Sequence, residues 1–323
     1  MTIHVSPDNF IRAETDLYFG NILRGGVLGQ FVHFHDLGPI DAQLVVRQNR
    51  DTLYSAAVFD LDAGPVSVTL PDAGSRYRSM QVITQDHYVP EFSYAAGPHT
   101  FSREDIGTRY VMLALRTLVD PNDPADLTAV HALQDGVVVE QAGRGSFDVP
   151  DWDPHSQKAV RDALVTLFAT LPDTRGMFGA EGAVDPVRRL IGAAAAWGGN
   201  PEREALYLPV TPDDNDGQTV HKLTVSDVPV DGFWSVTVYN ADGYFTPNPA
   251  NAYSLNNITA VPDADGAVTI RFGGCDDSVP NCLPITPGWN YLVRLYRPRP
   301  EILNGPWTFP SAQPIGQSDS EAP

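Results

Sequence analysis

The chain has 323 residues, of which 42% are hydrophobic and 10% aromatic, and its formal net charge at pH 7 is -19. This length exceeds what one core usually organises, so we expect two domains, and the apolar content excludes a disordered chain. The strong negative charge excludes binding to nucleic acid or to anionic lipid, because both need a basic face.

The predicted elements begin with a helix over residues 7–31, where apolar residues recur on one face and Gly25-Gly26 ends or breaks it. Residues 43–120 are predicted to form short β-strands, because turn dipeptides such as Gly64-Pro65 separate apolar or alternating runs. A helix over 123–133, capped by Asp123, and a return strand over 137–141 follow.

The second half continues with helices and then returns to strands. Ser156 and Asp185-Pro186 are predicted to start two helices, and hairpin turns such as Asn240-Ala-Asp-Gly243 then separate alternating runs. The fold class is therefore mainly β, with two antiparallel β-sandwich or jelly-roll-like domains, a helical N-terminal segment and a helical bridge. We predict an N-terminal domain over 1–141, the bridge over 142–203 and a C-terminal domain over 204–323.

Location and cysteine chemistry are predicted from local sequence. The first residues carry no basic segment followed by an apolar one, and no run of about 18 apolar residues could cross a membrane. We therefore expect a cytoplasmic protein without membrane contact. In that compartment Cys275 and Cys282 would be reduced thiols, although a loop-closing disulfide or, less well, a metal site also fits their spacing.

The polar stretch Arg47-Gln-Asn-Arg-Asp-Thr-Leu-Tyr-Ser55 is the most unusual segment of the chain. It places two guanidiniums, a carboxylate, an amide and a phenol beside apolar strands, which is costly unless these groups satisfy one another. If the stretch is a strand, alternation separates Arg47, Asn49 and Asp51 from Arg50 and Tyr54. It is either a structural polar knot or the wall of a site.

Several motifs together resemble a bacterial two-domain family, known only as tandem domains of unknown function (numbers twelve fifty-four and twelve fourteen). The motifs are Asn49-Arg-Asp-Thr-Leu-Tyr-Ser55, Leu61-Asp-Ala-Gly-Pro65, Phe233-Trp-Ser-Val-Thr-Val-Tyr239 and Arg294-Leu-Tyr-Arg-Pro298. The resemblance covers residues 5–312 and implies two β-sandwich domains joined by helices, a bacterial origin and a homo-oligomer. Some members are labelled carboxylesterases, without a mechanism that transfers to this chain.

Histidines are the second group of candidate functional residues. His87 follows Asp86 at a predicted strand end, where an imidazole can act as a general base, and Asp51 could orient it if the two strands are neighbours. His33 and His35 are predicted to share one face of a strand and would form half of a metal site, with His87 as a third ligand. The alternative for all three is a histidine with ordinary hydrogen bonds.

The sequence therefore predicts a cofactor-independent enzyme, a hydrolase of a small, partly apolar ester, amide or lactone. His87 is the predicted base and Asp51 its orienter, and Arg50, Asn49 and Tyr54 would stabilise developing negative charge. The predicted substrate-binding residues are Arg47, Gln81, Tyr88, Trp197 and Trp234.

The alternative function is a non-catalytic small-molecule-binding or assembly protein, in which the same residues form a structural knot. No metal or other cofactor is part of either prediction. No Gly-x-Ser-x-Gly motif and no phosphate-binding glycine loop before a helix occurs in the sequence, so an ordinary serine hydrolase and nucleotide binding are not indicated.

Overall fold

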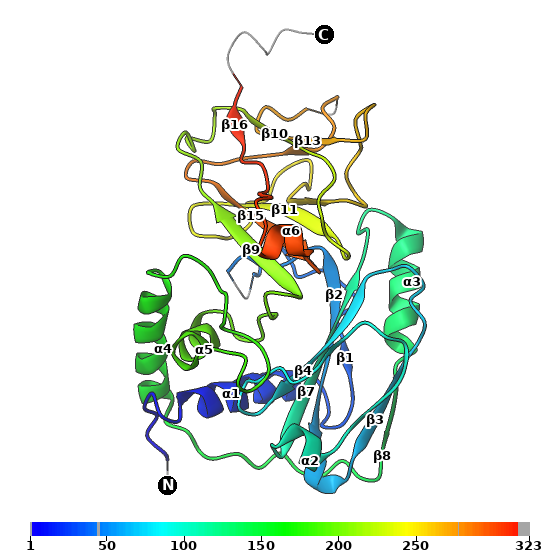
Figure 1. The fold of residues 1–323 in the computed structure, drawn as a ribbon, viewed down its shortest axis with the longest axis vertical. Coiled ribbons are helices and arrows are strands. Elements are labelled where there is room, and N and C mark those ends of the chain that lie inside the picture. The colour runs from blue at the N-terminus through cyan, green and yellow to red at the C-terminus, as the bar shows by residue number, and fades with distance from the viewer. Residues whose placement is uncertain (1, 44–45, 277, 316–323) are drawn as a thin grey trace. The chain divides into compact units, whose positions relative to one another are not determined.

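The computed structural model describes residues 2–43, 46–276 and 278–315, and its chain divides into two compact units (Figure 1). Unit 1 comprises residues 1–35 and 52–204, and unit 2 comprises residues 36–51 and 205–323. The chain is mainly β, as predicted, with antiparallel sheets in both units. The helices predicted to form a bridge over 142–203 belong to unit 1, because they pack on its first helix.

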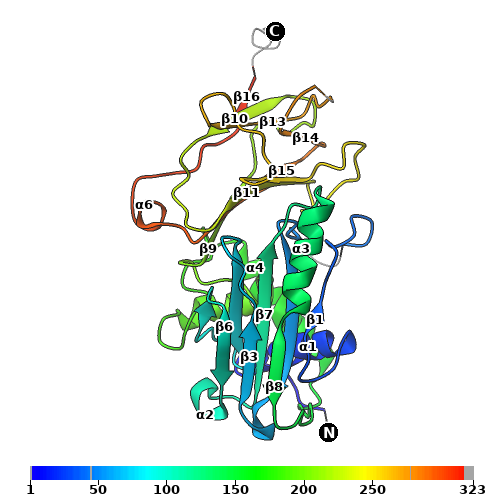
Figure 2. The ribbon, with the colours of Figure 1, turned by 90° about the vertical axis from the view of Figure 1, so that its right-hand side faces the viewer.

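Unit 1 contains a large sheet of five strands and a small sheet of three strands, all paired antiparallel. The large sheet has the order β1 (Val32–His33), β2 (Thr52–Asp60), β7 (Tyr110–Leu118), β4 (Arg78–Thr84) and β5 (Phe92–Ser93), and the small sheet has the order β6 (Gly97–Phe101), β3 (Val66–Leu70) and β8 (Val138–Gln141). The two sheets share one apolar core that includes Phe59, Val68 and Leu113 (Figure 2). They therefore form a sandwich.

The opposite face of the large sheet is covered by helices (Figure 1). Phe19 of the first helix packs there against Val58 and Ile83. The helices of unit 1 are α1 (Phe10–Arg24), α2 (Arg103–Ile106), α3 (Pro124–Asp135), α4 (Pro154–Phe168) and α5 (Pro186–Ala195), and η1 (Leu61–Ala63) is a 3-10 turn.

Three helices of unit 1, α3, α4 and α5, begin with an aspartate cap followed by proline. Asp123 and Asp185 cap α3 and α5 as predicted, with side-chain oxygens that accept from backbone N–H groups. The prediction that Ser156 caps α4 is wrong. Asp153 is the cap, because its side chain accepts from the N–H groups of residues 155 and 156, and α4 therefore starts earlier than predicted. The first helix ends at Arg24, before Gly25, and is shorter than predicted.

Unit 2 is a second sandwich with two four-stranded sheets (Figure 2). One sheet has the order β12 (Ser254–Asn256), β11 (Trp234–Tyr239), β15 (Asn290–Tyr296) and β9 (Ala205–Val210), and the other has the order β14 (Cys282–Leu283), β13 (Val268–Phe272), β10 (His221–Val225) and β16 (Gln313–Pro314). Side chains from both sheets, including Val236, Phe272 and Trp289, form its core. A short helix, α6 (Pro300–Leu303), follows β15.

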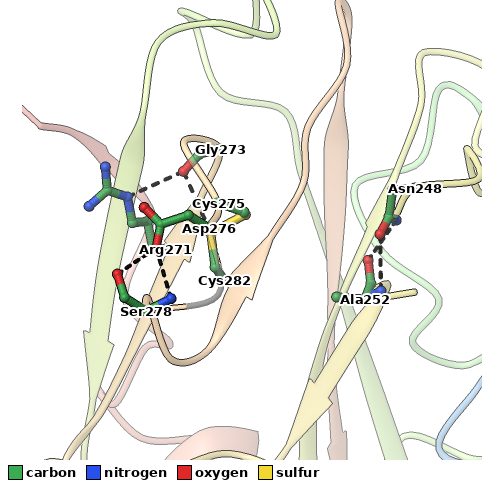
Figure 3. Close-up of a disulfide and its surroundings, with 8 residues drawn as sticks. All are labelled: Asn248, Ala252, Arg271, Gly273, Cys275, Asp276, Ser278 and Cys282. Atoms are coloured by element: carbon green, nitrogen blue, oxygen red, sulfur yellow. Dashed lines mark hydrogen bonds between the residues drawn. A yellow bond between two sulfur atoms is a disulfide. The ribbon is translucent and has the colours of Figure 1, made fainter. Parts of the chain in front are cut away.

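The two cysteines form a disulfide in unit 2, Cys275–Cys282 (Figure 3). It closes the loop between β13 and β14, which pair in parallel through Arg271 and Phe272. The Cα atoms of the two cysteines lie 5.5 Å apart, a separation that a disulfide spans. The prediction that both cysteines are reduced thiols, as expected in a cytosol, is therefore wrong. No helix among the described residues is long and apolar enough to span a membrane.

Candidate functional site

The first half of the polar stretch is irregular backbone in unit 2, and the strand β2 begins only at Thr52. The alternation predicted for residues 47–51 is therefore wrong. Arg47 adopts a positive φ of 51°, and the Asn49 side-chain oxygen accepts a hydrogen bond from the Asp51 N–H at 2.6 Å. Such an Asx turn competes with strand pairing, so these side chains do not alternate between two faces.

Asp51 is the centre of a buried hydrogen-bond network in unit 2, which we call the polar knot. The carboxylate is fully buried and accepts from Ser235 Oγ at 2.6 Å and from Ser254 Oγ at 3.1 Å. Asn256 Nδ2 donates a third bond at 3.3 Å. These donors come from β11 and β12, so the knot attaches residues 36–51 to the sheet of unit 2.

Arg294, on the neighbouring strand β15, completes the polar knot. Its guanidinium is buried and donates to Thr237 Oγ1 at 2.7 Å, to Tyr239 Oη at 2.7 Å and to the Arg47 carbonyl at 2.9 Å. Burial acts to lower the pKa of Arg294, but the neighbouring tyrosines and Asp51 outweigh it and raise the pKa. Arg294 therefore stays charged and holds the backbone of the polar stretch.

Three further polar side chains of this segment have structural partners. Arg47 donates to Asn290 Oδ1 at 3.1 Å, and Asn49 donates to Tyr296 Oη at 2.8 Å. The half-buried Arg50 donates to the Gly38 carbonyl and lies over the ring of Tyr253 at 5.3 Å. Burial lowers the pKa of Arg50. Each predicted charge-stabilising group of unit 2 thus contributes to the fold of that unit.

Two predicted site residues meet at one end of the large sheet in unit 1. Gln81 accepts from Arg116 Nη1 at 2.9 Å and donates to the Gly199 carbonyl at 2.8 Å. The Arg116 guanidinium lies 5.4 Å from the centre of the Tyr54 ring. Asn200 accepts a further bond from Arg116 at 2.5 Å. This cluster fixes the loop after α5 onto the sheet.

His87 is a buried structural histidine in unit 1. Its Nε2 accepts a hydrogen bond from the Gly198 N–H at 2.9 Å, and its ring stacks on Trp197 with centroids 5.3 Å apart. Burial lowers the pKa of His87 to about 3, and the charge of Arg189 adds to this effect. The residue is 1% exposed, and its Nδ1 has no partner among the described residues. His87 is therefore neutral and enclosed.

The predicted orientation of His87 by Asp51 gains no support from these contacts. Asp51 belongs to unit 2 and His87 to unit 1, and each takes its hydrogen-bond partners from its own unit. The remaining predicted binding residues also pack locally. Tyr88 lies under the guanidinium of Arg189 at 4.2 Å, and Trp234 is part of the core of unit 2.

His33 and His35 lie on the same side of the chain around β1, as predicted, with parallel rings 6.1 Å apart. His33 Nδ1 is 2.8 Å from Ser55 Oγ, and His35 Nε2 is 3.1 Å from Asp135 Oδ1. No group of three or more His, Cys, Asp or Glu side chains in the described part of the chain could hold a metal ion. The three-histidine site with His87 does not form.

A groove of about 510 Å³ opens beside His33 in unit 1, and we call it the β1–β8 groove. Its lining comes from residues in and beside the edge strand β1 of the large sheet and the edge strand β8 of the small sheet. The lining comprises residues 29–31, His33, Val137, Val139 and residues 141–144. This volume is within the range of small-molecule sites, whereas a pocket in unit 2 has only about 100 Å³.

Sequence reasoning missed this groove. Phe31, Val137 and Val139 provide its apolar wall and pack on the core of the sandwich, while Arg144 stands exposed on its rim. Residues 31 and 137 are far apart in sequence, and residues 143–154 have the composition of an ordinary loop. The one sequence feature that could have pointed to the groove is Gly143-Arg-Gly145, in which a cationic side chain stands between two glycines.

The family is shown by the two matches within the chain. Residues 28–104 match "Protein of unknown function (DUF1254)", and residues 204–300 match "Protein of unknown function (DUF1214)". The chain belongs to the family that carries these two domains in tandem. Both matches agree with the resemblance seen in the motifs, and neither description states an activity.

Two solved structures share the fold. The VPA0106 protein from Vibrio parahaemolyticus is 18% identical, with a TM-score of 0.72 over 96% of this chain and 98% of that chain. A putative uncharacterized protein from Burkholderia cenocepacia is 15% identical, with a TM-score of 0.51 over 90% of this chain and 84% of that chain. No curated protein matches the chain. At these identities the likeness concerns the fold alone.

Proposed function

We propose that the protein binds a small, partly apolar molecule in the β1–β8 groove of unit 1, and that the polar stretch has a structural role. The observation that carries this proposal is the groove itself. Its volume is about 510 Å³, Phe31, Val137 and Val139 give it an apolar part, and polar groups, among them His33 and Arg144, make up the larger part of its lining. Ligand sites combine these features, because apolar contact supplies affinity and a few polar groups fix orientation.

The structural role of the polar stretch is supported by the saturation of its groups. The Asp51 carboxylate accepts three side-chain hydrogen bonds, and the Arg294 guanidinium is occupied by Thr237, Tyr239 and a backbone carbonyl. A general base or an oxyanion clamp needs a group that is open toward the substrate. Buried groups with fixed partners fit a knot better.

The hydrolase hypothesis stays a prediction. Its proposed base, His87, is enclosed and has a lowered pKa, so the hypothesis requires an opening of the Trp197 side of unit 1 before a substrate could reach the ring. Homo-oligomerisation and the absence of a cofactor are likewise predictions. The cytoplasmic location is a prediction against which the disulfide weighs, because such bonds persist mainly in oxidising compartments.

The groove proposal is tested by ligand screening with two matched variants. Ala142 lines the groove and is exposed, so Ala142→Trp fills space there without removing a core side chain. Val138 is 53% exposed on the same edge and does not line the groove, so Val138→Trp is the control. A panel of small apolar and amphipathic molecules is screened by NMR, with backbone signals as the readout.

We expect panel members to shift the signals of residues 29–33 and 137–144 in the wild type and in Val138→Trp, and Ala142→Trp to lose these shifts. Binding that maps to other residues, or that Ala142→Trp leaves unchanged, would contradict the proposal. Equal loss in both variants would also contradict it, because the effect would then be unspecific.

A further inference from the structure

We propose that the ligand of the β1–β8 groove is a monocarboxylate with a short apolar body. Arg144 would pair with the carboxylate, and the Nε2–H group of His33 would donate a second hydrogen bond. This inference rests on the proposed function and names the class of ligand for the same groove.

The first step concerns the charge at the groove. Arg144 is the one charged arginine, lysine, aspartate or glutamate among the described lining residues, and its side chain is exposed. No hydrogen bond or ion pair engages its guanidinium within the described part of the chain. A planar guanidinium with five N–H donors matches a carboxylate in a two-bond geometry. The local charge therefore selects an anion, although the protein as a whole is acidic.

The second step concerns Asp60, a carboxylate that contacts the backbone just after Arg144. Asp60 accepts from Arg109 Nε at 3.0 Å and Nη2 at 2.8 Å, and from the Ser146 N–H at 3.1 Å. Gly145 has φ +69°, and a Cβ at this position would lie 2.3 Å from Asp60 Oδ2. The backbone after Arg144 is thus held against Asp60, whose own charge is met by Arg109. The contact with Asp60 positions the backbone next to Arg144, but Asp60 does not neutralise the charge of the Arg144 guanidinium.

The third step concerns the orientation of His33. Ser55 Oγ accepts from Gln134 Nε2 at 3.2 Å, lies 2.8 Å from His33 Nδ1 and has one hydroxyl hydrogen that it can donate to this nitrogen. In the tautomer that the proposal uses, Nδ1 accepts this hydrogen and Nε2 carries the ring proton. Burial lowers the pKa of His33, so the ring is neutral near pH 7 and offers a donor without a second charge.

The fourth step concerns what the groove does not offer to an anion. Gln141 Nε2 is already used by the carbonyls of Asp60 and Gly64, at 2.8 and 2.9 Å. Its amide hydrogens are therefore not available to a ligand head group. The lining also includes Phe31, Val137 and Val139, whose apolar side chains suit an alkyl or aryl body. A ligand with one anionic head group and one apolar body would match this arrangement of charged and apolar residues in the groove.

The test compares octanoate with octanamide, which has nearly the same shape and no charge. Affinities are measured by isothermal titration calorimetry for the wild type, Arg144→Gln and Arg24→Gln. Arg24 is an exposed arginine at the end of α1 that does not line the groove, so Arg24→Gln is the charge-matched control.

We expect octanoate to bind the wild type and Arg24→Gln about tenfold more tightly than octanamide, because a charge-assisted bond at the groove is worth about one power of ten. In Arg144→Gln this preference should disappear while octanamide binds as before. His33→Phe should weaken octanoate several-fold and leave octanamide less affected.

Two outcomes separate this inference from the proposed function. If both probes bind in the groove equally well and Arg144→Gln changes neither, the carboxylate inference is overturned while ligand binding stands. If neither probe binds, and no other molecule of the panel does, both fail together. Octanoate binding that Ala142→Trp does not reduce would place the anion elsewhere and would overturn the inference alone.

Discussion

The polar knot of unit 2 and the β1–β8 groove of unit 1 use similar chemical groups in opposite ways. In the knot, Asp51 and Arg294 are enclosed and their hydrogen-bonding groups meet partners from the same unit. In the groove, Arg144 is exposed without a partner among the described residues, and His33 has one ring nitrogen left over. The polar stretch therefore has the most charged and polar groups in its sequence, but the hydrogen-bonding atoms of its knot are already used within unit 2.

This difference shows how burial determines whether a polar group is available to bind a ligand. A buried charge is tolerated only when partners replace its hydration, and those partners then occupy the atoms that a substrate would need. An exposed charge needs no such partners and remains available. The predictions below test the comparison, and they run from the largest expected effect to the smallest.

Removal of the knot's carboxylate should give the largest effect. Asp51→Ala leaves Ser235, Ser254 and Asn256 without their acceptor and removes a negative charge that stabilises buried Arg294. We expect the free energy of unfolding to fall by about 3–5 kcal/mol. Urea denaturation measures this change, and Asp51→Asn, which keeps an acceptor oxygen, should lose less. A near-neutral Asp51→Ala would show that the knot is not structural.

The disulfide should have the next largest effect. It joins residues seven apart, and closing so short a loop restricts the unfolded chain by about 2–3 kcal/mol. We expect the double variant Cys275→Ser with Cys282→Ser to lose this amount of unfolding free energy. Reductant should lower the stability of the wild type to the level of the double variant and leave the variant itself unchanged. Equal sensitivity of both proteins to reductant would contradict the prediction.

The pH dependence of stability should report on His87. The unfolded chain takes up a proton on this residue near pH 6.5, whereas the folded protein resists protonation until about pH 3. Unfolding therefore becomes easier as the pH falls below 6.5, and this residue has no such effect above that pH. We expect a loss of about 1.7 kcal/mol between pH 6.5 and pH 5, because the slope rises from half of about 1.4 kcal/mol per pH unit at pH 6.5 to nearly that value at pH 5.

The comparison variants for this pH effect are His87→Phe and His155→Phe. His87→Phe removes the titrating group, so the slope of stability against pH between 6.5 and 5 should become shallower. His155 is exposed on α4, and its replacement should leave the slope unchanged. Identical slopes in all three proteins would mean that another group controls the acid sensitivity.

The smallest stability effect is expected at the groove. Arg144→Gln should change the free energy of unfolding by less than about 0.5 kcal/mol, because the exposed guanidinium has no partner to lose among the described residues. Chemical denaturation of this variant beside Asp51→Ala measures the comparison directly. A large destabilisation by Arg144→Gln would mean that Arg144 is a structural residue like those of the knot.

Much of the fold could be predicted from the sequence because its signals are local. The strands of residues 52–118 follow apolar or alternating runs separated by turn dipeptides, and the caps Asp123 and Asp185 precede prolines. The parallel rings of His33 and His35 follow from a period of two. The family motifs are also local.

The candidate site depended on contacts that no local pattern encodes. Assignment of residues 36–51 to unit 2 requires hydrogen bonds between Asp51 and residues about 200 positions away. Phe31 and Val139 line one groove only because two different sheets end at the same edge. The polar stretch was correctly identified as unusual, but the choice between a knot and a site required knowledge of its partners.

The discontinuous order of unit 2 also has a consequence for synthesis of the chain. Residues 36–51 leave the ribosome long before the strands with which they pack, since Ser235 lies 184 positions after Asp51. At about 5–20 residues per second, this separation amounts to roughly 10 to 40 s of translation. During that interval Asp51 stays in water, because the side chains that bury and hydrogen-bond its carboxylate have not yet been synthesised.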